Sequence, residues 1–145
     1  MIGVLRLKGK YVFVNISDEL PSAVFMIDMD SFKLLSVATR FNEKINQQDA
    51  DSLAELMTDD HAFVDSDGGV TRGKEVMKEG WRNFFKEYPD YRNVFTEMSV
   101  HDGVVVMVGY SVCSFKPLDG PNIWTAKIRD SRVAEWKVIW LNKRE

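Results

Sequence analysis

The sequence predicts an α+β domain in which a curved, mostly antiparallel sheet wraps over helices packed on one of its faces. Residues 31–57 and 74–88 carry apolar side chains at helical spacing, whereas residues 91–141 mostly alternate with the period of two typical of strands. One strand-like segment, residues 61–65, lies between the helical stretches. This segregation of helices from strands favours an α+β fold, and a length of 145 residues suits a single domain.

The helical stretches have recognisable ends. The first begins near Ser31, which suits a cap, and runs to about residue 47; the second covers about residues 50–57. Asp49 between them suits an N-cap, because its carboxylate can accept hydrogen bonds from the free backbone N–H groups that open a helix. The third helix is expected from about residue 74 to residue 88, where Pro89 stops it.

Alternation in the second half predicts which side chains face the core. Strands are expected at residues 91–100, 104–116, 123–129 and 133–141, and the apolar run of the second predicts burial on both faces. In the last two strands, parity predicts two sets of residues: Trp124, Ala126, Ile128, Trp136, Val138 and Trp140 pointing inward, and Lys127, Arg129, Glu135 and Lys137 pointing outward.

Residues 1–33 differ in pattern from the rest of the chain, which we divide into this N-terminal extension and a domain at 34–145. Alternating residues around Lys8-Gly9-Lys10 predict a β-hairpin, Pro21 ends any strand, and residues 23–29 fit a third short strand. The segment either covers the domain or a partner subunit, or is a poorly ordered extension.

Composition narrows the function classes. A net charge of −3 with mixed signs and no polybasic run argues against nucleic acid or an anionic membrane as the main partner. The one cysteine, Cys113, excludes an internal disulfide and fits a packed thiol. His61 and His101 lack the spacing of a zinc site, so no metal is expected. Without a transmembrane or signal segment, we expect a cytoplasmic protein.

Two runs of sequence resemble a known superfamily. They are FNEKINQQDADSLAELMTDDHAFVD at residues 41–65, followed by Gly68 and by RGKE at 72–75, and the ending RVAEWKVIW at residues 132–140. The chain over about residues 34–142 resembles the SnoaL-like proteins of the nuclear transport factor 2 (NTF2)-like superfamily. This resemblance implies a cone with a deep apolar pocket, and a homodimer formed through the outer face of the sheet.

Within that superfamily, the chain resembles the ketosteroid isomerases in part. Asp65 falls where those enzymes carry their general base, but Phe41 replaces the tyrosine of the oxyanion hole. Trp124 falls near the second oxyanion donor, a protonated aspartic acid. The loss of one such donor costs about a hundredfold in rate, so steroid isomerisation by that mechanism is not expected.

The catalytic prediction rests on Asp65. On a strand face beside Phe63 its carboxylate would be desolvated, which suits a general base near neutral pH. His61 shares that face, either as a second acid or base or as a rim residue. Trp124 or Tyr88 could donate a hydrogen bond to the substrate. The predicted substrate-binding residues are Phe41, Phe63, Trp81, Phe84, Tyr88, Trp124, Trp136 and Trp140.

We therefore expect a pocket for a small lipophilic molecule in a cofactor-independent enzyme of the isomerase, cyclase or hydrolase type. One alternative is a binding protein with the same pocket and no chemistry. Another is an interaction module in which residues 1–33 act as the contact arm. Epoxide hydrolysis is disfavoured, because it would need an inward arginine and two inward aspartates on the last strands, and only a one-residue register shift would supply them.

Overall fold

The computed structural model describes residues 2–7, 10–15 and 29–141. Its six-stranded sheet has the order β4-β3-β8-β7-β6-β5, and every neighbouring pair is antiparallel except β3 and β8, which are parallel. The elements are β1 (Ile2–Leu7), β2 (Lys10–Asn15), α1 (Met29–Asn46), α2 (Ala50–Glu55), β3 (Met57–Val64), β4 (Val70–Arg72), α3 (Lys74–Glu87), β5 (Arg92–His101), β6 (Val104–Val112), the 3-10 turn η1 (Lys116–Leu118), β7 (Gly120–Arg129) and β8 (Arg132–Trp140). The predicted α+β class is confirmed, and the sheet is mixed.

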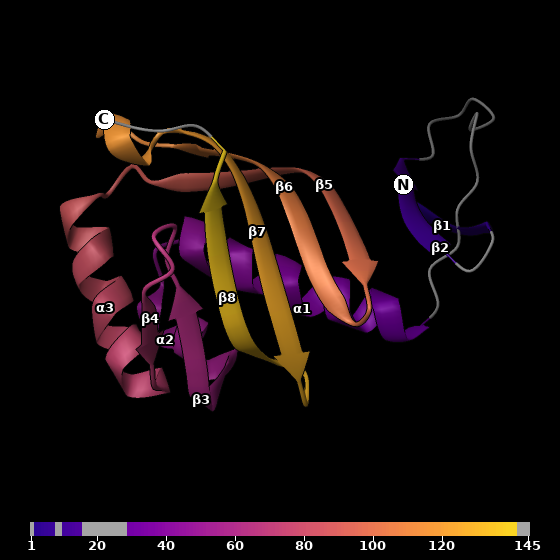
Figure 1. Cartoon of the computed structure of the whole chain (residues 1–145), viewed down its shortest axis with the longest axis horizontal. Coiled ribbons are helices and arrows are strands. Elements are labelled where there is room, and N and C mark those ends of the chain that lie inside the picture. Colours follow the sequence, from indigo (N-terminus) through magenta and orange to yellow (C-terminus); the bar gives the residue numbers. More distant parts are fainter. Residues whose placement is uncertain (1, 8–9, 16–28, 142–145) are drawn as a thin grey trace.

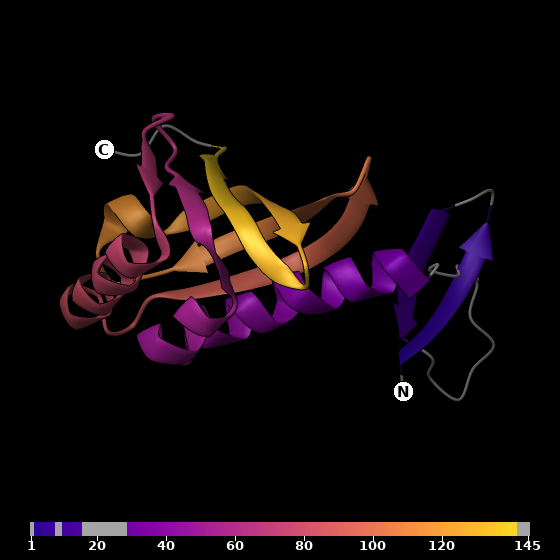
Figure 2. The same ribbon diagram turned by 90° about the horizontal axis from the view of Figure 1, so that it is seen from below.

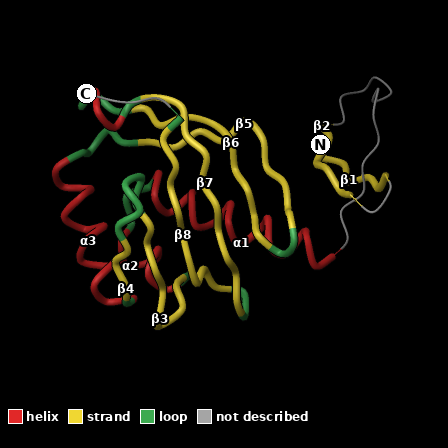
Figure 3. Tube along the Cα trace, viewed as in Figure 1, coloured by secondary structure: helices red, strands yellow, loops and turns green. Residues whose placement is uncertain are grey.

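Helix α1 lies across one face of the curved sheet, while α2 and α3 lie beside β3 and β4 (Figures 1, 2 and 3). The buried stripe of α1 includes Leu35, Ala38, Phe41 and Ile45, at the three- and four-residue spacing of one helical face. Because this stripe packs on the inner face of the sheet, the helix closes one side of the cone.

The boundary between α2 and β3 differs from the prediction. Asp49 is the N-cap of α2, as expected, and its Oδ1 accepts from the backbone N–H of Ser52 at 3.0 Å. Met57, expected at the end of the helix, instead opens β3 and is fully buried. An apolar residue fits the core equally well at either place, so periodicity alone could not place the boundary.

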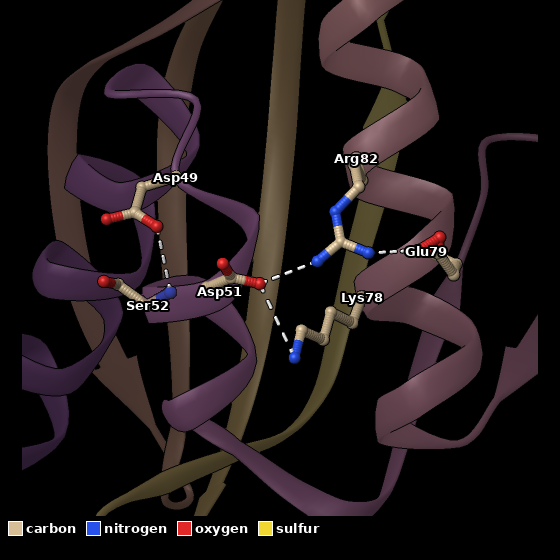
Figure 4. A network of polar contacts seen from close by, with 6 residues as sticks. All are labelled: Asp49, Asp51, Ser52, Lys78, Glu79 and Arg82. Atoms are coloured by element: carbon tan, nitrogen blue, oxygen red, sulfur yellow. Dashed lines mark hydrogen bonds and ion pairs between the residues drawn. The ribbon is translucent and has the colours of Figure 1, made fainter.

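Helices α2 and α3 are joined on their outer side by a polar cluster (Figure 4). The carboxylate of Asp51 lies 2.7 Å from Arg82 and 3.5 Å from Lys78, and Arg82 also pairs with Glu79. These side chains are partly to largely exposed, so each ion pair contributes little to stability. The apolar face of α3, including Met77, Trp81 and Phe85, is buried.

Strand β6 is buried on one face only, which corrects the predicted burial on both. Val105, Met107 and Ser111 are buried, whereas Tyr110 and Val112 on the opposite face are 43% and 44% exposed. The reason is that the helices of the described chain cover the inner face of the sheet and not its outer face. The short strand β4 was not predicted; it pairs with the end of β3.

The N-terminal hairpin is confirmed as the antiparallel pair β1–β2. In both views it lies beyond the N-terminal end of α1, apart from the larger sheet (Figures 1 and 2). Of the third strand expected at residues 23–29, all but Met29 lies outside the described residues, and Met29 begins α1. No helix within the described ranges is long and apolar enough to cross a membrane.

Candidate ligand-binding site

A cavity of about 400 Å³ lies between α3 and the inner face of the sheet. Its walls are mainly apolar and aromatic, and they include all four tryptophans of the chain. Among the described residues that line it, Asp65 carries the sole carboxylate, and there is no lysine or arginine. The lining consists of Phe63, Asp65, Ser66, Thr71, Val76, Met77, Gly80, Trp81, Phe84, Tyr91, Asn93, Leu118, Trp124, Trp136, Val138 and Trp140.

The predicted parity of β7 and β8 is confirmed. Trp124 pairs with Val138 across the two strands, and Trp136 and Trp140 share the same inner face. On the outer face Lys127 lies 3.6 Å from Glu135, and Arg129 pairs with Asp60. The one-residue shift that would turn an arginine inward is therefore not found.

Trp81 is the centre of the aromatic wall that α3 contributes. Its ring centroid lies 5.9 Å from that of Phe63 and 5.5 Å from that of Phe84, both in edge-to-face geometry. Trp81 is 7% exposed, and its indole Nε1 has no hydrogen-bond partner among the described residues. A buried donor without a partner costs about 1–3 kcal/mol, which a ligand acceptor that reached it would reduce.

Asp65 lines the cavity from its mouth, one residue beyond the end of β3. The desolvation expected for it is not found, because its side chain is exposed. Its Oδ1 accepts from the backbone N–H of Asp67 at 2.9 Å and from that of Gly69 at 2.8 Å. The carboxylate thus closes the turn between β3 and β4, and Oδ2 remains as the second acceptor.

His61 is completely buried, so its expected place at the rim is wrong. Its Nδ1 lies 2.7 Å from the backbone oxygen of Val133, and its ring packs 5.8 Å from that of Phe41. Since a carbonyl only accepts, Nδ1 carries the proton, and Nε2 is left without a partner in the described part of the chain. Burial lowers the pKa of His61 below its ordinary value of 6.5. His61 does not line the cavity, and no contact of the described residues joins it to Asp65.

Two of the eight predicted substrate-binding residues lie outside the cavity lining. Phe41 is fully buried in the core, with its ring 4.5 Å from that of Trp136. Tyr88 stacks on Phe115 at 5.3 Å, and its hydroxyl lies 3.2 Å from a carboxylate oxygen of Glu87. Phe63, Trp81, Phe84, Trp124, Trp136 and Trp140 do line the cavity.

The polar part of the lining was missed from the sequence. Tyr91 and Asn93 face the cavity. Their spacing of two residues, typical of side chains on one face of a strand, was the sequence feature that could have predicted this. Behind them Ser111 joins three partners: its Oγ lies 2.8 Å from Asn93 Oδ1, 2.6 Å from Asn122 Nδ2 and 3.0 Å from the Tyr91 hydroxyl. All four residues are buried, so a polar network sits in the inner wall.

Sequence comparison identifies the family of this chain. The model of the SnoaL-like domain family matches residues 38–136, which is more than half of the chain. This chain belongs to the SnoaL-like family. No curated protein matches the sequence.

Solved structures similar to this SnoaL-like protein share its fold at low sequence identity. An LEH-like epoxide hydrolase of M. tuberculosis is 12% identical with a TM-score of 0.68, covering 77% of this chain and 84% of its own. A candidate ketosteroid isomerase of Kribbella flavida is 14% identical with a TM-score of 0.66, covering 80% and 83%. An uncharacterised cystatin-fold protein of Novosphingobium aromaticivorans is 21% identical with a TM-score of 0.65, covering 73% and 97%. At such identities the likeness shows the NTF2-like cone and not an activity.

The chemistry open to this SnoaL-like cavity depends on its lining. Aromatic walls can bury a flat apolar molecule, and the few polar groups can fix its orientation. The carboxylate of Asp65 lies at the mouth, and the buried imidazole of His61 packs against Phe41, which in turn packs against Trp136 of the lining. The interior therefore offers hydrogen-bond donors but no buried pair of acid and base among the described residues.

Proposed function

We propose that this protein binds a small, flat and largely apolar molecule in the aromatic cavity. The observation that carries this proposal is that all four tryptophans line one cavity of about 400 Å³. That size lies within the range of about 300–1,000 Å³ usual for small-molecule sites. Removing an apolar ligand from water contributes about 25 cal/mol for each Å² that is buried, and edge-to-face or offset aromatic contacts add to this.

Tryptophan fluorescence provides a direct test, because every fluorophore of this type lies in the cavity wall. A naphthalene probe such as 2-isopropenylnaphthalene should quench or shift the emission in a saturable way and raise the melting temperature. If the probe changed neither the tryptophan emission nor the melting temperature, the proposal would be wrong.

A matched pair of variants locates the binding. Gly80 lines the cavity, and a Cβ added there would meet nothing within 4 Å. Gly80→Leu should therefore narrow the cavity and weaken binding, whereas Gly80→Ala should leave the affinity nearly unchanged. Equal affinities in both variants would place the probe elsewhere.

A second candidate function is general-base chemistry by Asp65. It is supported by the position of this carboxylate in the lining, with Oδ1 held by two backbone N–H groups and Oδ2 remaining. With a ketone in the cavity, the carboxylate would accept an α-proton while the C–H electron pair moves into the enolate. Return of a deuteron from the solvent would then exchange the α-position.

This candidate has its own experiment. The α-protons of 2-tetralone would be followed by NMR in D2O, with wild-type protein and with Asp65→Asn. Faster exchange in the wild type than in Asp65→Asn would support Asp65 as a general base. Equal exchange rates in the two proteins would contradict general-base chemistry and leave ligand binding as the one proposed function of the cavity. Binding of the hydrocarbon probe should be kept in Asp65→Asn, which separates the two functions.

We also propose that two copies associate through the outer face of the sheet. Five apolar residues are exposed on β5, β6 and β8 or just beyond the end of β8: Val94, Tyr110, Val112, Ile139 and Leu141. The register supports a continuous surface, because Val94 pairs with Tyr110 on the neighbouring strand and β7 links β6 to β8. Exposed apolar patches of this kind are typical of protein interfaces.

A further inference from the structure

Asn93 in the cavity wall is held by hydrogen bonds of both its backbone and its side chain. Its backbone N–H donates to Asn46 Oδ1 at 2.8 Å, and its backbone oxygen accepts from Asn46 Nδ2 at 2.8 Å and from Asn42 Nδ2 at 3.4 Å. Its side-chain Oδ1 accepts from Ser111 Oγ at 2.8 Å. Helix α1 and strand β6 therefore fix both the backbone and the amide plane of Asn93.

The positions of its two terminal atoms set which end of the Asn93 amide is free, because it is Oδ1 that lies 2.8 Å from Ser111 Oγ. A serine hydroxyl has one proton to donate and two lone pairs. Ser111 accepts from Asn122 Nδ2, which has protons only to give, and donates to Asn93 Oδ1. Its remaining lone pair accepts from the Tyr91 hydroxyl at 3.0 Å. The one proton and both lone pairs of the Ser111 hydroxyl are then used in hydrogen bonds, and the Oδ1 atom of Asn93 accepts one of them.

The nitrogen of that amide is left over. Asn93 lines the cavity and is 3% exposed, and its Nδ2 makes no hydrogen bond with a described residue. It is thus a donor whose orientation is set before any ligand arrives, and preorganised donors lose little entropy on binding. Trp81, whose buried Nε1 also lacks a partner in the described chain, stands in the same lining.

We propose that Asn93 selects ligands that carry a neutral hydrogen-bond acceptor, of the carbonyl type, on an otherwise apolar body. This inference rests on the proposed binding function and adds the polar end of the ligand to it. The acceptor oxygen meets the Asn93 amide N–H at the inner wall while the flat body lies among the tryptophans.

The lining favours a neutral acceptor over other polar groups. An anion would be desolvated with no lysine or arginine in the described lining to pair with it. A ligand hydroxyl or amine that only donated would leave the Asn93 and Trp81 donors unpaired, and buried donors of this kind are costly when left without an acceptor. A carbonyl oxygen satisfies a donor and needs no counter-charge.

Two isosteric probes test the inference. 2-Acetylnaphthalene and 2-isopropenylnaphthalene differ in a C=O that replaces a C=CH2, so they fill the same space. Each dissociation constant, measured by tryptophan quenching, is corrected for the partition of the compound between cyclohexane and water. We expect the corrected affinity for the ketone to exceed that for the hydrocarbon by about tenfold. A corrected ratio near one would overturn the inference.

Variants assign this preference to Asn93. Asn93→Leu keeps the approximate shape but removes the donor, so the corrected ratio should fall to about one while the hydrocarbon still binds. Asn83→Leu is the matched control, because Asn83 is exposed on α3 and outside the lining; it should keep the preference. A ketone preference that survives Asn93→Leu would overturn the assignment.

A spectroscopic measurement on the wild-type protein covers the case in which Asn93→Leu does not fold. The infrared C=O stretch of bound 2-acetylnaphthalene should lie below its position in cyclohexane, as expected for an accepted hydrogen bond. A stretch equal to that in cyclohexane would refute the inference. If the hydrocarbon binds and the ketone shows no preference, only this inference fails; if neither compound binds, the proposed function fails with it.

Discussion

The Oδ1 atom of Asp65 accepts a hydrogen bond of 2.8 Å from the backbone N–H of Gly69, and this contact ties the mouth of the cavity to the β3–β4 turn. Gly69 also has no room for a side chain, because a Cβ placed on it would lie 2.6 Å from Asp65 Oδ2. Asp65, the candidate base proposed from the sequence, therefore also has a structural role. The effect of any substitution at Asp65 can therefore arise from the loss of its hydrogen bonds to the β3–β4 turn as well as from the loss of a base.

Amide hydrogen exchange should reveal this structural role. In Asp65→Ala the backbone N–H groups of Asp67 and Gly69 lose their acceptor, and we expect both to exchange about fivefold faster, the equivalent of one ordinary hydrogen bond. Asp65→Asn is the control, because its side-chain oxygen can still accept. Equal exchange in wild type and Asp65→Ala would show that the two bonds do not protect the turn.

Gly109 should tolerate no side chain. A Cβ there would lie 1.9 Å from the backbone oxygen of Val94, next to the bulge in the pairing of β5 and β6. Since the contacting atoms are backbone, the strands must separate, and Gly109→Ala should lower the free energy of unfolding by about 1–3 kcal/mol or more. Gly80→Ala, in the middle of α3, should raise it by about 0.5–1 kcal/mol. Urea unfolding followed by fluorescence measures both, and a Gly109→Ala variant as stable as wild type would contradict the close approach.

Much of the fold could be predicted from the sequence because the periodicity is local. The Asp49 cap and the inward tryptophans of β7 and β8 depend on neighbours within a few residues, and these predictions are confirmed. The parallel pairing of β3 with β8 joins segments far apart in the chain, and no local signal specifies it. Strand β4 has only three residues, too few for a pattern.

The candidate site was predicted in part, for a physical reason. A tryptophan on an inward position contributes to the wall wherever the strand lies, so the aromatic lining follows from parity. Predicting the polar part of the wall requires the pairing register of the strands. Asn93, Ser111 and Asn122 come from three strands and meet only when those strands are correctly aligned. Each of these residues taken alone fits a surface position equally well. The burial of His61 likewise depends on the irregular pairing between Met57 and Ala62.

The outer face of the sheet should control association. Val112→Lys places a charge among the apolar residues Val94, Tyr110 and Ile139, and an unpaired charge buried in an interface should raise the dimer dissociation constant by about a hundredfold. Sedimentation velocity would show a shift from dimer to monomer. Val76→Lys is the matched control, since Val76 is 57% exposed but belongs to α3 and the cavity. A wild-type protein that sediments as a monomer would contradict the proposed dimer.

His61 should make stability depend on pH in acid solution. Burial is the main cause that holds the pKa of its imidazole below 6.5 in the folded protein, and the hydrogen bond to Val133 opposes the shift only in part. Below pH 6.5 the unfolded chain therefore binds a proton that the folded chain does not. This contribution to stability is fully present above pH 6.5 and is lost as the pH falls from there toward the folded-state pKa. The change in the free energy of unfolding with pH approaches about 1.4 kcal/mol per pH unit when one proton is bound on unfolding.

The two histidines of the chain allow this slope to be assigned. His61→Gln keeps a side-chain N–H that can donate to Val133 and removes the titrating group, so its unfolding free energy should change less between neutral pH and about pH 5 than that of the wild type. His101→Gln is the control, because His101 is exposed and bonded to Ser99 at 2.9 Å; it should keep the wild-type slope. Carboxylates also titrate toward the lower end of this range, but they are common to all three proteins and cancel in the comparison. If His61→Gln and the wild type lose stability in parallel, the buried imidazole is not the source of the acid sensitivity.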